Sequence, residues 1–387
     1  MSLCSGERSE VQREVLWMIV LTVGLLGSHC EGAISCKNED DKDVDWFILY
    51  KVKKGFDYVY TDSTNQNLRR NNKHVNNQAG VLANTLKPYF EKDKQSSDFG
   101  FIAYNDQPPN ENSVSSTHGH SKGFVMIDED NVVWLLHSTP RFPFSHESNN
   151  FYPKNGERNA QIFMCVTLKS TESAEIAQHL KDIKAYKFEE HNPVKLTDSS
   201  TVQQQTRPYN KDLRSAGNSL FKRFVKQTSA TRDPEVGDLY VTIADTLNTN
   251  LYIQTWRSDR GEPSVTGNGK ELVTIMSVDT AAGKWNHGCD HSKWCVSDTQ
   301  DWMCVGDSNR ELSQFERPGG ALCINSKPVA DAFREIKKLE KIKKAGATAG
   351  ATAGATAGAT AGATAGAADS DIDCVTDPPS KKPKVHG

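Results

Sequence analysis

Apolar residues along this chain gather in short runs that are separated by polar stretches. Several runs are rich in β-branched, aromatic and aliphatic side chains, a composition that favours strands. The predicted strands are Trp46–Val52, Phe124–Ile127, Val132–His137, Ile162–Leu168, Leu239–Ile243, Leu251–Trp256 and Leu272–Val278. Strands occur in both halves of the chain, so the pattern predicts a protein with a large content of β-sheet.

Two other segments, Glu172–Tyr186 and Pro328–Lys344, place apolar residues three and four positions apart, which is the spacing of one helix face. The second segment begins with a proline, which suits the first turn of a helix. The apolar positions are Ile176, Leu180 and Ile183 in the first segment, and Val329, Phe333, Ile336 and Leu339 in the second. Strands mixed with helices predict an α+β or α/β fold.

Polar stretches mark the candidate boundaries. Asp62–Asn77 is rich in asparagine, and Thr197–Lys211 is similarly polar. We use the second stretch to divide an N-terminal lobe, residues 33–200, from a C-terminal lobe, residues 201–344. An Ala-Gly-Ala-Thr repeat follows from Ala345 and lacks large apolar side chains, so residues 345–387 are predicted to be a disordered linker with a basic tail.

The N-terminus has the layout of a secretory signal peptide. Arg8 and Arg13 precede an apolar run from Val15 to Leu26, and small and polar residues follow up to Gly32. A run of about a dozen residues is short for a bilayer core of ~30 Å. We therefore predict a signal peptide at residues 1–32, with a signal anchor as the alternative. The mature chain is expected to have no membrane span.

Composition and charge restrict the function only weakly. The 387 residues are 36% hydrophobic and 25% charged, and 46 basic against 49 acidic residues give a net charge of −3. Any contact with DNA must therefore come from a local basic cluster, not from bulk charge. Seven cysteines remain after residue 32, an odd number that leaves one thiol free or joined to another chain.

Two short motifs carry candidate chemistry. His120-Ser121-Lys122 lies in the first lobe, and His291-Ser292-Lys293 lies in the second, where Asp298 follows five residues later. Alternate residues of a strand face the same side, so each histidine and lysine can address one cleft. A lysine can hold phosphate oxygens, and an imidazole can act as nucleophile or as acid and base near neutral pH. Two copies fit phosphodiester cleavage.

Other interpretations of these motifs stay open at this point. A single His-x-Lys motif is more often a solvated surface pair than a catalytic one. His118 and His120 are also two residues apart, as metal ligands on a strand often are, although no third ligand is obvious nearby. The absence of a Cys-x-x-Cys pair gives no sign of a structural zinc site, so we predict neither a metal nor another cofactor.

The ordered motifs from about Cys36 to Lys344 resemble the deoxyribonuclease II family of acid endonucleases. The landmarks are Val44-Asp45-Trp46-Phe47 with Tyr50-Lys51, His118-Gly119-His120-Ser121-Lys122-Gly123, Trp134-Leu135-Leu136-His137-Ser138-Thr139-Pro140-Arg141, Asp290-His291-Ser292-Lys293-Trp294, Cys304-Val305-Gly306-Asp307-Ser308-Asn309-Arg310 and Gly319-Gly320 with Cys323. Residues beyond Lys344 lie outside the family pattern.

The resemblance implies a phospholipase D-like, two-lobed pseudo-dimer with a β-sheet core in each lobe. It also implies cleavage of double-stranded DNA without a divalent metal, best at acid pH, leaving 3′-phosphate and 5′-hydroxyl ends. By motif, His120 with Lys122 and His291 with Lys293 form the two halves of one site. We assign His120 as the nucleophile that forms a phosphohistidine and His291 as the acid, with the reverse assignment as the alternative.

Further residues are carried over by resemblance. His137 and Arg141 are expected to contact substrate, against a buried structural histidine and a surface arginine as alternatives. Asp298 is expected to orient the second half-site, whereas Asp128 departs from that spacing by one residue. Expected disulfides are Cys36–Cys165 and Cys304–Cys323. We add the hypothesis that Cys289 pairs with Cys295, which would leave Cys374 free to join another chain.

Two further function classes compete with this prediction: a phospholipase D-like lipid phosphodiesterase, and a catalytically inactive DNA-binding or toxin-like protein. The landmarks outside the His-x-Lys motifs weigh against the first, and the retention of both motifs weighs against the second. The signal peptide predicts a secreted or lysosomal protein. The sequence has no Asn-x-Ser/Thr acceptor for N-linked sugar, which favours secretion.

Overall fold

The computed structural model describes residues 33–91, 97–193, 209–256, 264–340 and 342. The expected signal peptide, the polar stretch chosen as the lobe boundary and the repeat tail therefore lie wholly or mostly outside the described residues. None of the helices in the described part of the chain is long and apolar enough to cross a membrane.

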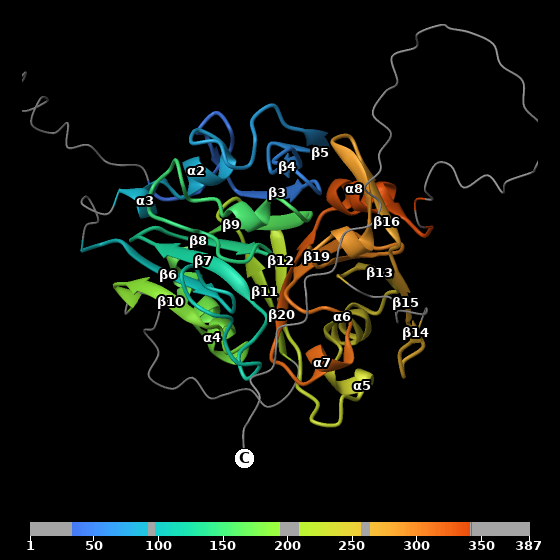
Figure 1. Cartoon of the computed structure of the whole chain (residues 1–387). Helices are drawn as coiled ribbons and strands as arrows, with labels where there is room; N and C mark the ends of the chain where they lie inside the picture. Colours follow the sequence, from blue (N-terminus) through green and yellow to red (C-terminus); the bar gives the residue numbers. More distant parts are fainter. Residues whose placement is uncertain (1–32, 92–96, 194–208, 257–263, 341, 343–387) are drawn as a thin grey trace, which may run out of the picture. The chain divides into compact units, whose positions relative to one another are not determined.

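The first half of the chain forms an eight-stranded antiparallel sheet in the order β10-β6-β7-β8-β9-β3-β4-β5 (Figure 1). Its strands are β3 (Trp46–Lys51), β4 (Tyr58–Asp62), β5 (Asn65–Arg70), β6 (Gly100–Asn105), β7 (Lys122–Ile127), β8 (Asn131–His137), β9 (Gln161–Lys169) and β10 (Lys187–His191). All residues of β3, β7 and β8 are buried, because both faces of the sheet are covered. The four strands predicted in this half are confirmed.

The second half forms another eight-stranded sheet, in the order β11-β12-β20-β19-β18-β13-β15-β14. Its strands are β11 (Tyr209–Arg214), β12 (Leu220–Val225), β13 (Leu251–Gln254), β14 (Ser264–Val265), β15 (Glu271–Thr274), β18 (Trp294–Ser297), β19 (Trp302–Gly306) and β20 (Gly320–Asn325). Only the β13–β15 pair is parallel in this sheet. Two minor sheets join β1 (Cys36–Lys37) to β2 (Asp43–Val44), and β16 (Ser277–Thr280) to β17 (Gly283–Asn286) and β21 (Lys337–Lys338).

The two large sheets repeat one topology. Strands β6-β7-β8-β9-β3 correspond in order to β13-β18-β19-β20-β12, and a helix follows the fourth strand in each half. The α+β pseudo-dimer with a β-sheet core in each half, predicted from the sequence, is thus confirmed. Its two halves share a hydrophobic core, in which Trp46 and Trp134 belong to the same cluster as Trp294 and Phe333.

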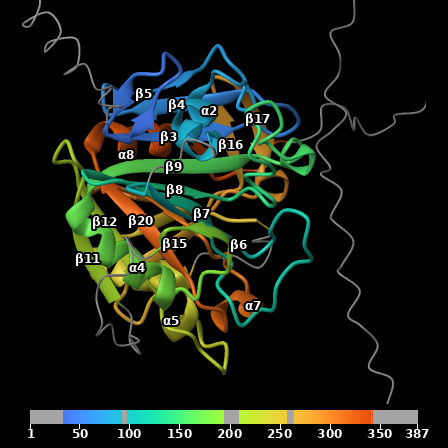
Figure 2. The same cartoon turned by 90° about the vertical axis from the view of Figure 1, so that its left-hand side faces the viewer.

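Seven helices accompany the sheets in the described residues. They are α2 (Val81–Thr85), α3 (Lys87–Phe90), α4 (Ser173–Asp182), α5 (Pro234–Gly237), α6 (Leu239–Leu247), α7 (Leu312–Phe315) and α8 (Lys327–Ile336). Each of the two predicted helices packs against the opposite half. Helix α4 lies beside β11 and β12 (Figure 2), where Glu175 pairs with the buried Arg223 at 2.7 Å. Ser326, just before α8, donates a hydrogen bond to Gln66 of β5 at 2.7 Å.

The strand predicted at Leu239–Ile243 is wrong, because these residues begin helix α6. The Asp238 side chain accepts a hydrogen bond from the backbone N–H of Tyr240 at 2.9 Å and so caps the first turn. The helix ends at Asn248, whose φ of 53° is left-handed. These local caps outweigh the strand preference of a short run rich in β-branched residues.

Two other segments are shorter than predicted. The strand expected at Leu272–Val278 is divided between β15 of the large sheet and β16 of the three-stranded sheet. The helix expected at Pro328–Lys344 ends at Ile336, because Lys337 is extended and pairs with Val278 in β21. Because both segments end early, the residues that follow them can form β16 and β21, which pair in the three-stranded sheet.

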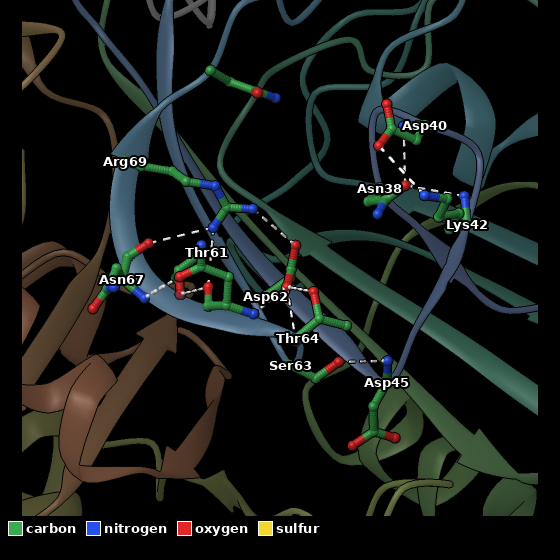
Figure 3. A network of polar contacts seen from close by, with 12 residues as sticks. Asn38, Asp40, Lys42, Asp45, Thr61, Asp62, Ser63, Thr64, Asn67 and Arg69 are labelled. Carbon is green, nitrogen blue, oxygen red and sulfur yellow. Dashed lines mark hydrogen bonds and ion pairs between the residues drawn. The ribbon is translucent and has the colours of Figure 1, made fainter.

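A polar network at the edge of the first sheet leads to a contact between the halves (Figure 3). Asp62 in β4 pairs with Arg69 of β5 at 3.2 Å, and the neighbouring Ser63 hydroxyl accepts a hydrogen bond from the backbone N–H of Asp45 at 2.9 Å. The Asp45 carboxylate in turn accepts hydrogen bonds from Gly217 N at 2.6 Å and from Ser219 Oγ at 2.9 Å. Asp45 thus fixes the β11–β12 turn to the first half.

Disulfides join Cys36 to Cys165 and Cys304 to Cys323, the two pairs implied by the family resemblance. Cys295 is a buried free thiol, whereas Cys289 is itself disulfide-bonded. The bridge expected between Cys289 and Cys295 is therefore wrong. Cys374, which was expected to be free, lies outside the described residues.

Candidate active site

The two His-x-Lys motifs occupy equivalent places in the two sheets. His120 and Ser121 immediately precede β7, which begins at Lys122, and the second motif immediately precedes β18. Strands β7 and β18 each lie between equivalent neighbours, β6 and β8 in the first sheet and β13 and β19 in the second. The fold therefore places each motif at the start of the same strand of the repeat.

The first half-site is built around a buried carboxylate. Asp106 directly follows β6 and is 4% exposed. Its Oδ1 accepts a hydrogen bond from Lys122 Nζ, and its Oδ2 lies 3.2 Å from Arg317 Nη2 and 3.8 Å from His120 Nε2. Burial by itself raises the pKa of Asp106, but the charge of Lys122, followed by its other cationic neighbours, holds that pKa well below its ordinary value.

The other ring nitrogen of His120 fixes its tautomer. His120 Nδ1 lies 3.1 Å from the backbone oxygen of Asp307, which belongs to the second half of the chain. A carbonyl oxygen only accepts hydrogen bonds, so Nδ1 carries the proton and donates it. In the neutral ring, Nε2 then carries the lone pair. The geometry therefore presents the nucleophilic nitrogen on the side of Lys122 and Asp106.

Burial keeps His120 neutral. It lowers the pKa of His120 well below the ordinary value of 6.5, and although the carboxylate of Asp106 opposes this effect, the charges of Lys122, Lys293 and Arg317 reinforce it. Because Lys293 of the second motif is one of these cations, the two motifs share one electrostatic environment. Burial thus favours the neutral form of His120.

The second half-site has a different environment. The backbone N–H of His291 donates to Ala160 O at 3.0 Å, and Ala160 forms a parallel bridge with Asp290, so the first half of the chain holds this loop. Lys293 Nζ donates to the backbone oxygen of His291 at 2.7 Å. The ring of Trp256 lies 4.4 Å from the ring of His291, measured between centroids.

Lys293 is buried, with 4% of its surface exposed. Burial, followed by the charge of Lys122, lowers its pKa to about 7, although the charges of Asp106, Asp290 and Asp307 oppose this effect. Its ammonium group is therefore charged in acid solution and loses its proton just above neutral pH. An anion such as a phosphate group that approaches Lys293 would raise its pKa again.

A buried polar cluster supports the loop that carries His291. The carboxylate of Asp290 accepts hydrogen bonds from Tyr50 Oη, from Trp285 Nε1 at 2.7 Å and from the backbone N–H of Ser292 at 2.9 Å. The Tyr50 hydroxyl also accepts a hydrogen bond from Trp294 Nε1 at 3.2 Å. Because Tyr50 lies in β3, this cluster ties the second motif to the first sheet.

His137 ends β8 and is 5% exposed. Its ring packs against Phe142 at 4.9 Å and against Phe163 at 5.6 Å between centroids. Neither ring nitrogen has a hydrogen-bond partner among the described residues. Burial and the charge of Lys122 lower the pKa of His137 well below its ordinary value. His137 is thus a buried ring close to the first half-site, in surroundings that favour its neutral form.

For two other predicted residues, the hydrogen bonds seen in the described part of the chain are with residues outside the motifs. Arg141 has an exposed side chain, and its backbone N–H donates to Gln107 O at 2.8 Å. Asp298 follows β18, at the opposite end of that strand from Lys293. Its carboxylate accepts hydrogen bonds from Thr249 Oγ1 at 3.0 Å and Asn250 Nδ2 at 2.9 Å. It thereby fixes the turn before β13, not the imidazole of His291.

Sequence reasoning missed several residues of the site. Asp106 and Trp256 contact motif residues directly, Arg317 contacts Asp106 and the backbone just before His120, and the landmark residue Asp307 contacts His120 through its backbone. Periodicity gives no signal for them, because they follow strands or lie in loops. One available signal was position: Asp106 and Trp256 come just after strands that neighbour the motif strands. The described residues contain no group of three or more His, Cys, Asp or Glu side chains arranged to hold a metal ion.

Among the solved structures that resemble this chain, the likeness described here is weak. Phosphatidylserine synthase of Haemophilus influenzae aligns with a TM-score of 0.30 and 11% identity, over 65% of this chain and 67% of that one. The sequence comparisons are stronger. The chain is 31% identical to mouse deoxyribonuclease-2-alpha over 332 residues, which cover 79% of this chain and 92% of the mouse protein.

Two other relatives match over similar lengths. Human deoxyribonuclease-2-beta is 31% identical over 81% of this chain and 93% of its own length. Plancitoxin-1 of Acanthaster planci is 30% identical over 82% of this chain and 94% of its own length. The family model for deoxyribonuclease II matches residues 35–342, which include both half-sites and both sheets. This chain belongs to the deoxyribonuclease II family.

Proposed function

We propose that this protein is an endodeoxyribonuclease that hydrolyses double-stranded DNA through a phosphohistidine intermediate, without a metal or other cofactor, and leaves 3′-phosphate and 5′-hydroxyl ends. The observation that carries the proposal is the geometry of His120. Its Nδ1 donates to Asp307 O at 3.1 Å, and its Nε2 lies 3.8 Å from Oδ2 of Asp106, the carboxylate that pairs with Lys122. Membership of the family supports DNA as the substrate.

In the first step, His120 Nε2 attacks the phosphorus atom and forms a P–N bond. The bond between phosphorus and the 5′ oxygen breaks, and protonated His291 gives its proton to that oxygen. The products of this step are a 5′-hydroxyl end and a phosphohistidine that carries the 3′ end. In the second step, water attacks phosphorus, His291 takes a proton from that water, and the P–N bond breaks. The 3′-phosphate is released.

The lysines supply the positive charge that the phosphoryl group needs as its charge is redistributed. Lys122 and Lys293 are both 4% exposed, so their charges act in a region of low dielectric constant. His137, with its buried and unpartnered ring nitrogens, and the exposed Arg141 are assigned to the positioning of substrate. Asp298 acts on the second half-site only through the turn that it fixes.

The protonation states favour activity in acid. His120 must be neutral to attack, and its pKa lies well below 6.5. Lys293 must be charged, and its pKa is lowered to about 7. His291 must carry a proton at the start of the first step. We therefore expect the rate of cleavage to increase as the pH falls through about 7. The rate should decrease again at the lower pH at which His120 becomes protonated.

The expected location follows from the sequence and not from the fold. A signal peptide at residues 1–32 sends the chain into the secretory pathway, to a lysosome or to the outside of the cell. Two disulfides, Cys36–Cys165 and Cys304–Cys323, are consistent with an oxidising compartment. We assign no particular cysteine to an intermolecular disulfide, because the free thiol among the described residues, Cys295, is buried. Electrophoresis with and without a reducing agent tests for such a bond.

The test of this function is plasmid cleavage by the purified protein at pH 5 and pH 8, with excess chelator, followed by analysis of the ends. We expect cleavage in chelator, faster at pH 5, with 3′-phosphate ends. Activity that appears only after addition of magnesium would refute the proposed chemistry. Loss of cleavage under all conditions would favour the inactive binding protein.

His118→Ala is the matched control for this experiment. His118 lies two residues before His120, and its ring contacts Tyr186 at 5.3 Å between centroids. If His118 and His120 held a metal, both alanine variants would be inactive. We expect His118→Ala to keep most of its activity and His120→Ala to lose it.

A further inference from the structure

We propose that Asp106 and Arg317 are positioning residues that hold the first half-site, and that the carboxylate of Asp106 opposes phosphate binding there, so that a DNA phosphate interacts mainly with the charge of Lys293. This inference rests on the proposed function for its meaning in catalysis. Its central measurement, phosphate binding by the resting protein, does not require turnover.

Asp106 forms ion pairs with the cationic side chains of the first half-site. Its carboxylate pairs with Lys122 Nζ and, at 3.2 Å, with Arg317 Nη2, while the three side chains are 3 to 11% exposed. Lys122 therefore already has a counter-ion before substrate arrives. By contrast, the contact of Lys293 is with a backbone carbonyl, which carries no net charge.

Arg317 extends this arrangement across the molecule. Besides Asp106, its guanidinium donates to His118 O at 3.0 Å and to Gly119 O at 3.2 Å. These two residues lead directly into His120. Arg317 comes from the second half of the chain, so it fixes both the loop before His120 and the carboxylate beside it.

The repeat shows that the carboxylate is specific to one half. Asn105 lies opposite Lys122 in the β6–β7 register, and Asp106 is the next residue. Gln254 lies opposite Trp294 in the β13–β18 register, which places Thr255 opposite Lys293 and makes Trp256 the equivalent of Asp106. The same position thus holds a carboxylate near His120 and an aromatic ring near His291.

A carboxylate in a phosphate site has a physical consequence. It repels the bound phosphate in substrate and product alike, and so it lowers affinity without blocking the chemical step. It also keeps Lys122 and His120 in a fixed geometry. We therefore infer that Asp106 favours release of the 3′-phosphate product and prevents strong inhibition by free phosphate.

The experiment compares Asp106→Asn and Arg317→Met with the wild-type protein, using inorganic phosphate as the probe. Removing the carboxylate charge is expected to tighten phosphate binding on the order of tenfold, because a partly buried unit charge is lost. Removing the arginine leaves Asp106 less neutralised and is expected to weaken phosphate binding. Both variants should cleave plasmid DNA more slowly.

The opposite directions distinguish this role from structural damage, which would weaken phosphate binding in both variants. Unchanged or weaker binding by Asp106→Asn would overturn the proposal. If that variant does not fold, as judged by near-UV circular dichroism, unchanged phosphate binding by Arg317→Met would also overturn it. Asp106→Glu keeps the charge, and we expect near wild-type phosphate affinity from it together with slower cleavage.

A second readout is the pH profile of cleavage. Asp106 raises the pKa of both His120 and Lys122, while Lys122, Lys293 and Arg317 are the cations that face His120. Asp106→Asn should lower both pKa values and should therefore move the plot of cleavage rate against pH to lower pH. The control is Glu175→Gln, which removes a carboxylate paired with Arg223 and Lys211 outside the site. It should change neither phosphate affinity nor the profile, and a shift equal to that of Asp106→Asn would overturn the assignment.

Discussion

The two half-sites of this protein share a motif and a strand position but differ in what surrounds the histidine. His120 lies beside a buried carboxylate and an arginine, whereas His291 lies against the ring of Trp256. In the first half, the lysine is paired with a charge, and in the second it contacts a backbone carbonyl. The comparison teaches that a repeated motif does not imply repeated chemistry.

The largest expected effect separates the roles of the two histidines. On normal DNA, His120→Ala should lose cleavage by on the order of 10⁵-fold, and His291→Ala by roughly 10²–10⁴-fold. A DNA substrate with sulfur in place of the 5′ bridging oxygen has a leaving group that needs no acid. Rates on this substrate should recover for His291→Ala and not for His120→Ala.

The opposite pattern of rescue would reverse the assignment of nucleophile and acid. Rescue of neither variant would mean that both histidines are needed for attack or for binding. Wild-type rates on the two substrates serve as the reference, because the sulfur substrate also reports whether proton donation limits the reaction.

The next effect compares the disulfides of the two halves. Cys36 and Cys165 are 129 residues apart, and Cys304 and Cys323 are 19 apart. In the chain-entropy model, removing the first bridge costs about 5 kcal/mol of unfolding free energy and removing the second about 3 kcal/mol. Paired Cys→Ala variants in urea unfolding measure the two values, and an equal loss would contradict the loop-length explanation.

Both cysteines of the second bridge must be replaced together. Cys295 is free and lies opposite Cys304 in the β18–β19 register. A Cys323→Ala variant would leave Cys304 next to this thiol and allow a new bridge to form. Mass analysis of unreduced peptides detects that product.

A smaller effect concerns the pH dependence of Lys293. Its pKa is lowered to about 7, so wild-type cleavage should fall about tenfold for each pH unit above that value. The Lys293→Arg variant keeps its positive charge at this pH. Between pH 7 and pH 8, its rate should therefore fall by a smaller factor than the wild-type rate does. Rates at saturating and limiting DNA over pH 4–9 test this expectation. An identical slope in both proteins would show that another group, such as His291, sets the alkaline limit.

The smallest predicted effect is at Trp256. An aromatic face attracts the protonated imidazole of His291, so Trp256→Leu should destabilise that protonated form and reduce cleavage by about tenfold. Trp256→Phe retains an aromatic face and should lie nearer to wild type. Equal losses in both variants would mean that the size of the indole matters and not its electrostatic effect on His291.

The parts of the fold that the sequence predicted are those with strong local patterns. Buried strands such as β3, β8 and β9 are continuous apolar runs, and α4 and α8 have regular apolar faces. Leu239–Leu247 was misjudged because its helix depends on a capping carboxylate at Asp238 and a left-handed residue at its end. A residue-type preference averaged over a short run does not register such caps.

The same limit applies to the site. His120, Lys122, His291 and Lys293 were found because each pair is contiguous in sequence and strand geometry keeps the pair on one face. The contact between Asp106 and Arg317 joins residues 211 positions apart, and the contact between His120 and Asp307 joins residues 187 apart. Only the packing of the two sheets creates these contacts. Asp298 shows the converse, since its spacing matches the motif while the length of β18 carries it away from the site.

Asp106 and Trp256 occupy the same position of the repeat, and this difference affects the direction in which a DNA strand can bind. A site with two identical halves would accept a strand in either direction and would cut it equally well both ways. Under the proposed roles, Asp106 and Trp256 remove that equivalence, so the 3′ side of the broken bond always stays with His120. With these roles, the protein distinguishes the polarity of a DNA strand without reading its bases.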